Sequence, residues 1–390
     1  MSTIFQYIGV NSMETRIPLS RPYIDKDDIN AVKNVMKSGY LSLGPKLPEF
    51  ERAIADYVGA KYAVAVNSGT SALHLCIRAT GIKEGDEAIT TPYSFIASAN
   101  CILFEKATPV FVDIDENTLN IDADKIEEVI TENTKAILPV HVFGLPAEMD
   151  KIMAIAKKHN LKVIEDAAEA LGAKYKGQNV GTFGDCGIFA FYPNKQMTTG
   201  EGGIIVTNNE QIRDLCISMR SQGRGANDDW LKHVRLGYNY RLNEMSCALG
   251  LSQLKKIDFL LKKRAEVASY YNTILSKFKD VIIPSENLEL QRSWFVYVIR
   301  VKENIYRDKV IKILVENDIQ SKQYFPAIHL QDFYRNEFGY HEGMFPVCEK
   351  VSNSTLALPF FTSMKKSQVK TVCKLLKQAI KESKTESKKE

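Results

Sequence analysis

Several common signatures are missing from this chain of 390 residues, and each absence excludes a class of protein. The seven cysteines are widely spaced, with no Cys-x-x-Cys pair and no cluster of histidine and cysteine, so we expect reduced core thiols and no metal site. The short apolar stretch at residues 4–10 has no basic start and too little length for a signal peptide or a membrane span. We therefore expect a cytoplasmic protein with no membrane partner.

A strong excess of charge is also missing. The formal net charge is +4, and part of it lies in the tail from Lys381 to Lys389, where lysines are mixed with serine, threonine and glutamate. This pattern is typical of a solvated chain end, so we expect no nucleic-acid partner. No Gly-x-Gly-x-x-Gly follows the first predicted strand, which argues against a nicotinamide dehydrogenase.

What is present is an ordinary globular composition, with 45% hydrophobic and 25% charged residues, and a length that suffices for two domains. Between Lys61 and Thr207, short β-branched runs alternate with helical patterns such as residues 71–79 and 149–158, which indicates a mostly parallel sheet flanked by helices. We expect the first of these helices to be buried. Seven strands are expected in one sheet, at residues 62–66, 87–91, 108–113, 136–142, 162–165, 187–191 and 203–207.

The later part of the chain predicts a smaller α+β unit. An amphipathic stretch at residues 243–275 is expected to bridge to it, and no long linker separates the two parts, so we expect them to pack together. Beyond it we expect a strand at residues 293–301 and helices at 308–316 and 366–377. We place a large domain at residues 13–258, a small domain at 259–382 and a flexible tail at 383–390.

Two residues of the predicted sheet point to cofactor chemistry. Lys195 follows an apolar strand, and a lysine held near apolar side chains loses its charge more readily and forms a Schiff base with a carbonyl cofactor. Asp166 ends another strand, where a carboxylate is suited to hold a pyridinium nitrogen protonated, as pyridoxal phosphate (PLP) requires. Lys195 alone would more often be a surface lysine, and Asp166 alone would more often be a helix cap or an ion-pair partner. Together on one sheet they favour a PLP enzyme.

Other segments follow the carboxyl ends of predicted strands, where open α/β sheets bind ligands. Residues 67–73 open a helix whose backbone amides face an anion such as a phosphate, although such residues often only cap a helix. Either Phe95 or Tyr93 stacks on a flat cofactor, or both belong to the core. Glu169 either shares a proton with a cofactor hydroxyl or favours the helix N-terminus.

In this order, the segments resemble the DegT/DnrJ/EryC1/StrS family of PLP-dependent sugar aminotransferases, over residues 18–361. The resemblance implies the fold type I architecture of aspartate aminotransferase: an α/β large domain with a seven-stranded, mostly parallel sheet, and a smaller α+β C-terminal domain. The matching motifs are Gly39-Tyr-Leu-Ser-Leu-Gly44-Pro45, Ser68-Gly-Thr-Ser-Ala72-Leu73, Glu165-Asp166-Ala-Ala, Lys195-x-x-x-x-Gly200-Glu201-Gly202-Gly203 and Gly237-Tyr-Asn239-Tyr-Arg241-Leu.

The resemblance also implies a role for each matching residue. Lys195 and Asp166 are the expected catalytic residues, which hold the cofactor covalently and pair with its pyridine nitrogen. Asn239 resembles an asparagine that reaches the phosphate of the neighbouring subunit, which implies a homodimer with shared active sites. Tyr324 and His329 match a loop near the nucleotide-sugar site, although His329 as an ordinary surface histidine is the alternative. The expected cofactor contacts are Gly69, Thr70, Ser71, Phe95, Asp166, Glu169, Lys195 and Asn239.

Two positions depart from the family pattern. Ala190 stands where the family usually has a serine that bonds the phosphate, and Asn194 or a water is the candidate replacement. Glu169 stands where glutamine or histidine is more common, which places a second carboxylate near Asp166 and predicts coupled titrations. Neither departure removes an essential catalytic group.

The resulting hypothesis is a transaminase that moves an amino group from glutamate, or glutamine, through PLP to a nucleotide-linked keto-deoxysugar. Family resemblance favours a 4-keto-6-deoxyhexose, used to make amino sugars for polysaccharides or glycosides. One alternative is a PLP-dependent sugar dehydratase, although those enzymes typically have histidine where this chain has Lys195. The other alternative is a regulatory or binding protein that has the PLP fold but no turnover.

Overall fold

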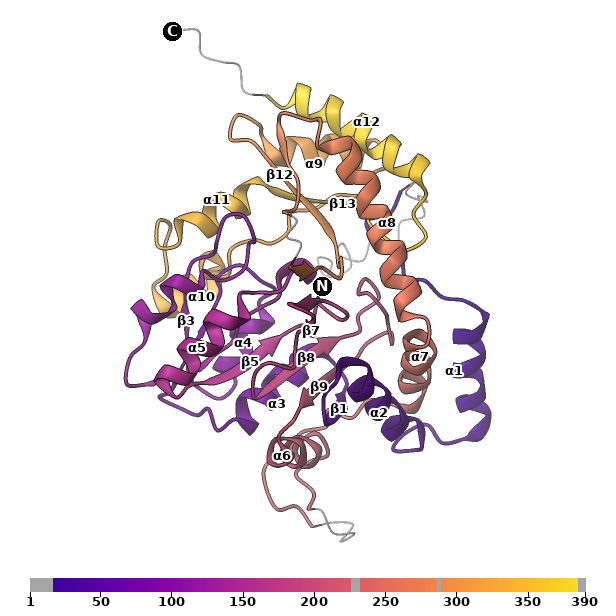
Figure 1. The fold of residues 1–390 in the computed structure, drawn as a ribbon, viewed down its shortest axis with the longest axis vertical. Helices are drawn as coiled ribbons and strands as arrows, with labels where there is room; N and C mark the ends of the chain where they lie inside the picture. The colour runs from indigo at the N-terminus through magenta and orange to yellow at the C-terminus, as the bar shows by residue number, and fades with distance from the viewer. Residues whose placement is uncertain (1–16, 226–231, 286–288, 385–390) are drawn as a thin grey trace.

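A computed structural model describes residues 17–225, 232–285 and 289–384. The expectations for residues 4–10, for the start of the large domain at residues 13–16 and for residues 385–390 of the tail lie outside these ranges. The centre of the molecule is a seven-stranded sheet with the order β1-β9-β8-β5-β4-β2-β3 (Figure 1). Its strands are β1 (Tyr62–Val66), β2 (Glu87–Thr90), β3 (Thr108–Phe111), β4 (Thr134–Ile137), β5 (Lys162–Asp166), β8 (Cys186–Ala190) and β9 (Gly203–Thr207).

The predicted sheet is confirmed in strand number and in strand direction. Strand β9 runs antiparallel to its neighbours β1 and β8, whereas the pairs β5–β8, β4–β5, β2–β4 and β2–β3 are parallel. Parallel strands leave their carboxyl ends at one edge of the sheet, so the segments that follow β1, β2, β5 and β8 are brought to the same edge.

Helices cover both faces of the sheet, which explains why most residues of its strands are apolar and buried. Alternate residues of a strand point to opposite faces, so Val64 packs with one helical layer and Ala65 with the other. One layer contains α3 (Gly69–Ala79), α4 (Ala97–Leu103) and α6 (Glu210–Arg220). The other contains α2 (Lys46–Val58), α5 (Met149–His159) and α7 (Glu244–Leu254). Helix α3 is buried along most of its length, as predicted.

Short elements complete the large domain. Helix α1 (Lys26–Ser38) begins at a capping box between Asp25 and Asp28 and ends at Gly39, whose φ of 76° favours glycine. All seven cysteines are buried free thiols. The remaining elements are η2 (Ala123–Val129), η3 (Val142–Gly144), β6 (Lys174–Tyr175) and β7 (Gln178–Asn179), with β11 (Leu290–Gln291) pairing on β6.

The smaller unit is built on a three-stranded antiparallel sheet, β10-β12-β13, packed against α8, α9 and α12. The stretch predicted at residues 243–275 is two helices, because α7 ends at Leu254 and α8 begins at Ile257. The expected domain boundary therefore falls inside α8. The elements are α8 (Ile257–Leu275), β10 (Val281–Ile282), β12 (Tyr297–Val301), α9 (Arg307–Glu316), η4 (Ile328–Leu330), α10 (Asp332–Phe338), α11 (Pro346–Ser354), β13 (Thr355–Leu358) and α12 (Lys366–Glu382).

The two parts pack directly on each other. Ile17 pairs with Ile319 of the smaller unit. The sequence assigned Ile17 to the large domain at residues 13–258, so the first described residues contact the other unit. Arg264 of α8 is buried and donates from Nε to Trp294 O at 2.7 Å and from one terminal nitrogen to Phe295 O at 2.5 Å. The same nitrogen lies 3.4 Å from Asn194 O of the large domain. This arginine therefore joins both parts next to Lys195.

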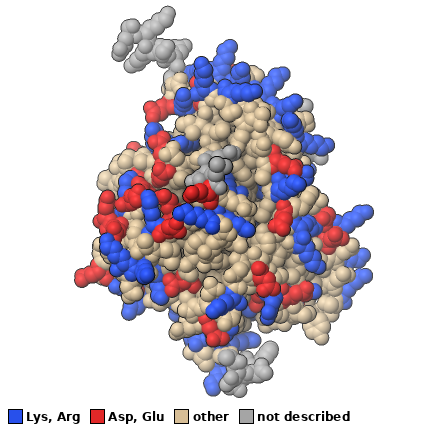
Figure 2. Space-filling model, viewed as in Figure 1, with Lys and Arg blue, Asp and Glu red and all other residues tan. Residues whose placement is uncertain are grey.

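The surface is mixed in charge, with acidic and basic side chains spread over the face shown in Figure 2. Basic side chains gather at the top of this view, over α12, whose sequence contains five lysines. None of the helices in the described parts of the chain combines the length and the apolar character that a membrane span needs.

Candidate active site

A cavity of about 520 Å³ lies where the carboxyl ends of β1, β2, β5 and β8 meet the smaller unit. Phe295, Tyr324 and Phe325 close it from the side of the smaller unit. Most of the residues predicted from the sequence line it, namely Gly69, Thr70, Phe95, Asp166, Glu169, Lys195 and Tyr324. The expectation that these segments meet at one edge of the sheet therefore agrees with the structure.

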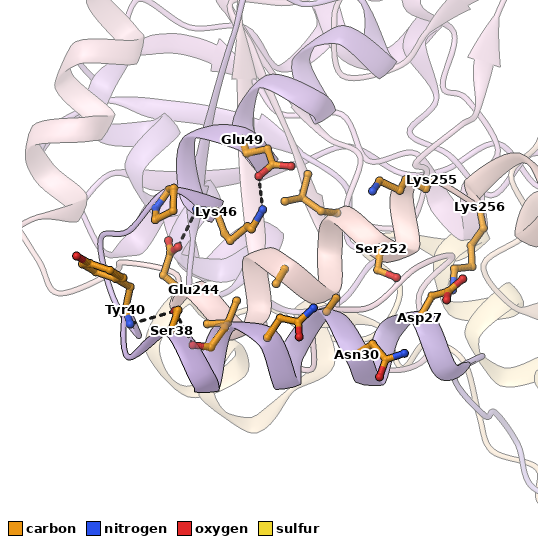
Figure 3. A pocket seen from close by; sticks show the side chains of 16 residues that line it. Asp27, Asn30, Ser38, Tyr40, Lys46, Glu49, Glu244, Ser252, Lys255 and Lys256 are labelled. Carbon is orange, nitrogen blue, oxygen red and sulfur yellow. Dashed lines mark hydrogen bonds and ion pairs between the residues drawn. The ribbon is translucent and has the colours of Figure 1, made fainter.

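A second, larger cavity of about 710 Å³ lies between α1, α2 and α7 (Figure 3). In it, the Lys46 ammonium contacts Glu49, and Glu244 accepts from the Lys46 backbone amide at 2.7 Å. None of the residues predicted for the site lines it. We therefore place the candidate active site in the smaller cavity.

Lys195 lies in the loop between β8 and β9. Its Nζ is 3.5 Å from Glu169 Oε1 and 3.9 Å from the centre of the Phe295 ring, and 13% of its side chain is exposed. The loop is fixed by hydrogen bonds from the Lys195 amide to Tyr192 O and from the Thr199 amide to Phe191 O. The amine therefore has one aromatic and one acidic neighbour inside a cavity.

Glu169 is buried beside this lysine. Burial raises the pKa of the Glu169 carboxyl, the Lys195 ammonium and the Phe143 amide oppose that shift, and the neighbouring Asp166 charge adds to it. The Phe143 amide donates to Glu169 Oε2 at 3.0 Å. The second carboxylate expected near Asp166 is therefore present and is electrostatically linked to it.

Asp166 ends β5 with both carboxylate oxygens occupied. Its Oδ1 accepts from the Ala168 amide at 3.1 Å, and its Oδ2 accepts from Ser98 Oγ at 2.7 Å. Sequence reasoning missed Ser98, although it lies in the same segment as Phe95, three residues further on. Phe95 is 60% exposed and lines the cavity, whereas Tyr93 is core and donates to Tyr324 O at 2.6 Å. Of these two rings, Phe95 is therefore the one that a flat molecule in the cavity can contact.

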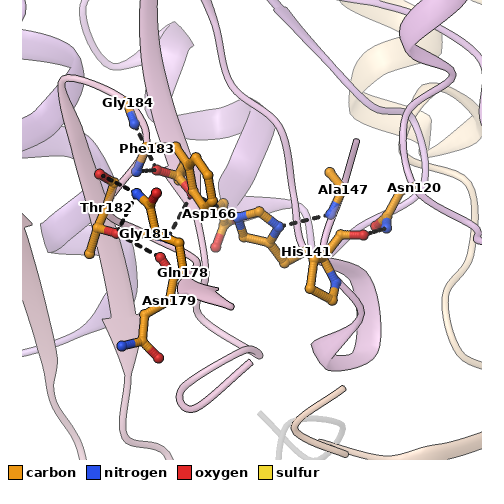
Figure 4. A network of polar contacts seen from close by, with 12 residues as sticks. Asn120, His141, Ala147, Asp166, Gln178, Asn179, Gly181, Thr182, Phe183 and Gly184 are labelled. Atoms are coloured by element: carbon orange, nitrogen blue, oxygen red, sulfur yellow. Dashed lines mark hydrogen bonds and ion pairs between the residues drawn. The ribbon is translucent and has the colours of Figure 1, made fainter. Parts of the chain in front are cut away.

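A buried polar network lies behind β5 and supports the position of Asp166 (Figure 4). Glu165 accepts from the amides of Gly181, Phe183 and Gly184 at 2.7–2.8 Å. His141 Nδ1 accepts from the Ala147 amide, so its Nε2 carries the proton and donates to Glu165 at 3.1 Å. The His141 amide also donates to Asp166 O. The network thus holds the end of β5 in place.

Family resemblance implies that the amides of Thr70 and Ser71, at the start of α3, hold the cofactor phosphate. Ser68 caps this helix, since its Oγ accepts from the Ser71 amide at 3.1 Å. The first amides of a helix have no partner within it, so those of Gly69 and Thr70 are suited to an anion in the cavity. A Cβ on Gly69 would lie 2.8 Å from the Ala190 Cβ, so glycine allows α3 to approach β8 closely. Ala190 itself lines the cavity, as does Asn194.

Three predicted residues lie outside this cavity. Ser71 is buried, and its Oγ donates to Asn67 Oδ1 at 2.7 Å. Asn239 is exposed and is fastened to the end of β1 by its own carbonyl, which accepts from Asn67 Nδ2 at 3.4 Å. His329 is fully buried and contacts Glu349 through Nε2 at 3.0 Å. His329 therefore does not line the cavity, and it does not have the surface position of the alternative.

The residues present fit a phosphorylated pyridine aldehyde. The start of α3 suits its phosphate, the exposed Phe95 ring suits its face, Asp166 suits a protonated ring nitrogen, and Lys195 is the amine within the same cavity. Among the residues that the structure describes, Lys195 is the lysine that lines this cavity.

Comparison with known proteins gives concordant results. A profile of the DegT/DnrJ/EryC1/StrS aminotransferase family matches residues 22–377. The chain is 40% identical over 378 residues to the spore coat polysaccharide biosynthesis protein SpsC of Bacillus subtilis, which covers 94% of this chain and 97% of SpsC. It is 41% identical over 323 residues to a GDP-perosamine synthase of Caulobacter vibrioides, which covers 82% of this chain and 87% of that enzyme.

A solved structure is similar over nearly the whole chain. Helicobacter pylori PseC, an aminotransferase involved in the biosynthesis of pseudoaminic acid, superposes with a TM-score of 0.90 at 31% identity. The match covers 94% of this chain and 99% of PseC. The matched region of the family profile includes every segment that lines the cavity.

Proposed function

Because this chain belongs to the DegT/DnrJ/EryC1/StrS aminotransferase family and is a PLP-dependent enzyme, we propose that it transfers an amino group from glutamate to a nucleotide-linked keto-deoxysugar. The names of GDP-perosamine synthase and SpsC support a sugar acceptor and a product used in polysaccharides. The observation that carries the proposal is the position of Lys195 Nζ, 3.5 Å from Glu169 in the cavity that also contains Asp166. Membership of an aminotransferase family favours turnover over the regulatory alternative.

Five residues of the cavity have a defined part in this proposal. Bound PLP supplies an electron sink for the carbon that loses a proton. Asp166 holds the ring nitrogen in its protonated form, and the amides of Gly69 and Thr70 hold the phosphate. Lys195 Nζ, once free, removes the proton from the α-carbon of glutamate. Glu169 holds this amine in the cavity.

The first half of the reaction is tested by absorption spectroscopy. With added PLP, the protein is expected to show a visible band that depends on Lys195 and that glutamate converts to a near-ultraviolet band. Lys195→Ala is expected to lose the visible band, whereas Lys158→Ala, which removes an exposed lysine of α5, is expected to retain it. Conversion by glutamate justifies a screen of nucleotide-linked keto-sugars as acceptors.

Two results would contradict the proposal in different ways. A visible band that glutamate leaves unchanged would exclude glutamate as the donor. A band that survives in Lys195→Ala would remove the residue on which the whole assignment depends.

A further inference from the structure

Ser98 makes a contact that the proposed function does not use. Its side chain is buried in the cavity wall, and its Oγ lies 2.7 Å from Asp166 Oδ2. The Ser94 Oγ lies 2.9 Å from the Ser98 Oγ. An ionised carboxylate only accepts hydrogen bonds, so the Ser98 hydroxyl donates to Asp166 and the Ser94 hydroxyl donates to Ser98. The two serines form a short relay that ends on the aspartate.

The direction of this relay follows from competition for one proton. Ser98 Oγ also lies 3.2 Å from Phe95 O, but a single hydroxyl proton serves one acceptor well. The contact with Asp166 is shorter and has a charged acceptor, which makes it the stronger of the two. The hydroxyl is therefore directed at the carboxylate.

An ordinary helical role does not account for this serine. Serines near the start of a helix usually bond the amides of their own first turn. Ser98 lies at the second residue of α4, yet its side chain contacts Asp166, 68 positions away in the sequence. A buried hydroxyl is costly unless it is paired, so this contact accounts for a polar residue at this buried position.

We propose that Ser98, supported by Ser94, is a positioning residue that fixes the orientation and charge of the Asp166 carboxylate. With the Ala168 amide on Oδ1 and Ser98 on Oδ2, rotation of the carboxylate breaks at least one hydrogen bond. A hydrogen bond donated to a carboxylate also favours its ionised form. The proton that Asp166 would share with a pyridine nitrogen bound in the cavity would therefore stay on the nitrogen. The inference rests on the proposed function, because it takes Asp166 as the partner of that nitrogen.

The test measures PLP affinity and the pH midpoint of the absorption band of bound cofactor, using the full-length protein freed of cofactor and then titrated with PLP. Ser98→Ala is expected to weaken PLP binding about tenfold, as for the loss of one hydrogen bond to a charged group, and to move the pH midpoint. Ser98→Thr retains a hydroxyl and is expected to restore both. Ser321→Ala, which removes a buried serine hydroxyl from the smaller unit, is expected to change neither.

Asp166→Asn distinguishes a failure of the inference about Ser98 from a failure of the proposed function. If it impairs PLP binding while Ser98→Ala behaves like Ser321→Ala, the inference is wrong and the proposed function stands. If Asp166→Asn has wild-type affinity and pH midpoint, the premise is wrong and the inference fails with it.

Should Ser98→Ala prove unfolded by circular dichroism, Ser94→Ala provides the test. It is expected to move the pH midpoint in the same direction, and a wild-type midpoint in that variant overturns the inference.

Discussion

Glu169 shows how burial and a neighbouring charge compete at a single residue. Burial favours the neutral carboxyl, whereas the Lys195 ammonium at 3.5 Å favours the charged form, and burial has the larger effect. A carboxyl whose pKa is raised in the folded state binds protons more tightly there than in the unfolded chain. The free energy of unfolding therefore decreases as the pH rises from the ordinary pKa to the raised one.

Glu169→Gln is expected to remove this pH dependence. The wild type should lose stability relative to the variant as the pH rises above 4.5, the ordinary pKa of glutamate, until the raised pKa has been passed. The difference should then stay constant. Urea unfolding of the cofactor-free proteins at steps between about pH 4.5 and pH 8 provides the measurement. Parallel stability curves would show that the pKa of Glu169 is not raised in the folded state.

Ala190 is the second residue at which family resemblance predicts a departure from the usual pattern. Because it lines the cavity against Gly69, a hydroxyl at this position would face the start of α3. Ala190→Ser is expected to tighten PLP binding by about threefold to tenfold, which corresponds to one additional hydrogen bond. Ala190→Val, which enlarges the side chain without a hydroxyl, is expected to weaken binding. Equal affinities of the two variants, measured by titration with PLP, would contradict a phosphate contact at this position.

Among the elements, strands and helices were predicted about equally well: the helix expected at residues 149–158 agrees with α5 (Met149–His159), whereas the strand expected at residues 136–142 already ends at Ile137 in β4. A run such as residues 203–207 is β-branched and buried on both faces, so its period and its bounds agree with β9. The break between α7 and α8 has no such signal, since Lys255 and Lys256 continue the amphipathic pattern. Lys256 lies just before α8 with a non-helical φ of −114°, and its ammonium bonds Asp25 at 2.6 Å, a contact 231 positions away. Only the folded chain contains that information.

The contact of α8 with the cavity wall depends on Arg264. Burial lowers the pKa of this guanidinium to about 10, so it stays charged at neutral pH, and it bonds backbone carbonyls of Trp294 and Phe295. Arg264→Met is expected to cost about 2–4 kcal/mol of unfolding free energy, because these carbonyls lose their donor. It should also weaken PLP binding, because Phe295 and the Lys195 loop lose their common support.

The matched control is Arg335→Met, which removes an exposed arginine of α10 and is expected to change stability by less than about 0.5 kcal/mol. Urea unfolding measures both variants. A loss of stability that is equal in the two would mean that the buried arginine does not join the two parts.

At the scale of the whole molecule, Asn239 is exposed and lies outside the cavity of its own chain. The Asn67 amide donates to Tyr240 O at 2.8 Å, which fixes the neighbouring backbone. On the adjoining segment, Val234 and Leu236 are exposed apolar residues. We propose that this segment contacts a second copy of the chain and completes the partner's phosphate site, as family resemblance implies.

Hybrid dimers test shared active sites. Lys195→Ala and Asn239→Asp are each expected to be inactive alone, because one lacks the amine and the other places a negative charge at the phosphate. After random mixing of subunits in equal amounts, about a quarter of wild-type activity should return, since half of the dimers each regain one complete site. Transamination assays before and after subunit exchange provide the measurement. An inactive mixture whose hybrids are present by mass spectrometry would exclude sharing through Asn239.

The sequence predicted the part of the site that lies at strand ends. Lys195 and Asp166 follow recognisable strands, and the sheet brings strand ends together. Ser98 and Phe295 were missed for different reasons. The role of Ser98 depends on the side-chain direction within α4, and Phe295 reaches Lys195 only because the smaller unit folds back over the sheet. Neither has a local sequence signal.

The residues that line the cavity are far apart in the sequence, and this bears on the order in which the parts of the protein fold during synthesis. The residues that line it run from Ser68 to Phe325, whereas the central sheet is complete once β9 has been synthesised. During translation the sheet therefore precedes the site, since domains generally fold from the N-terminus as the chain emerges. We therefore expect the cofactor to enter only after residues 295–325 have folded over the sheet.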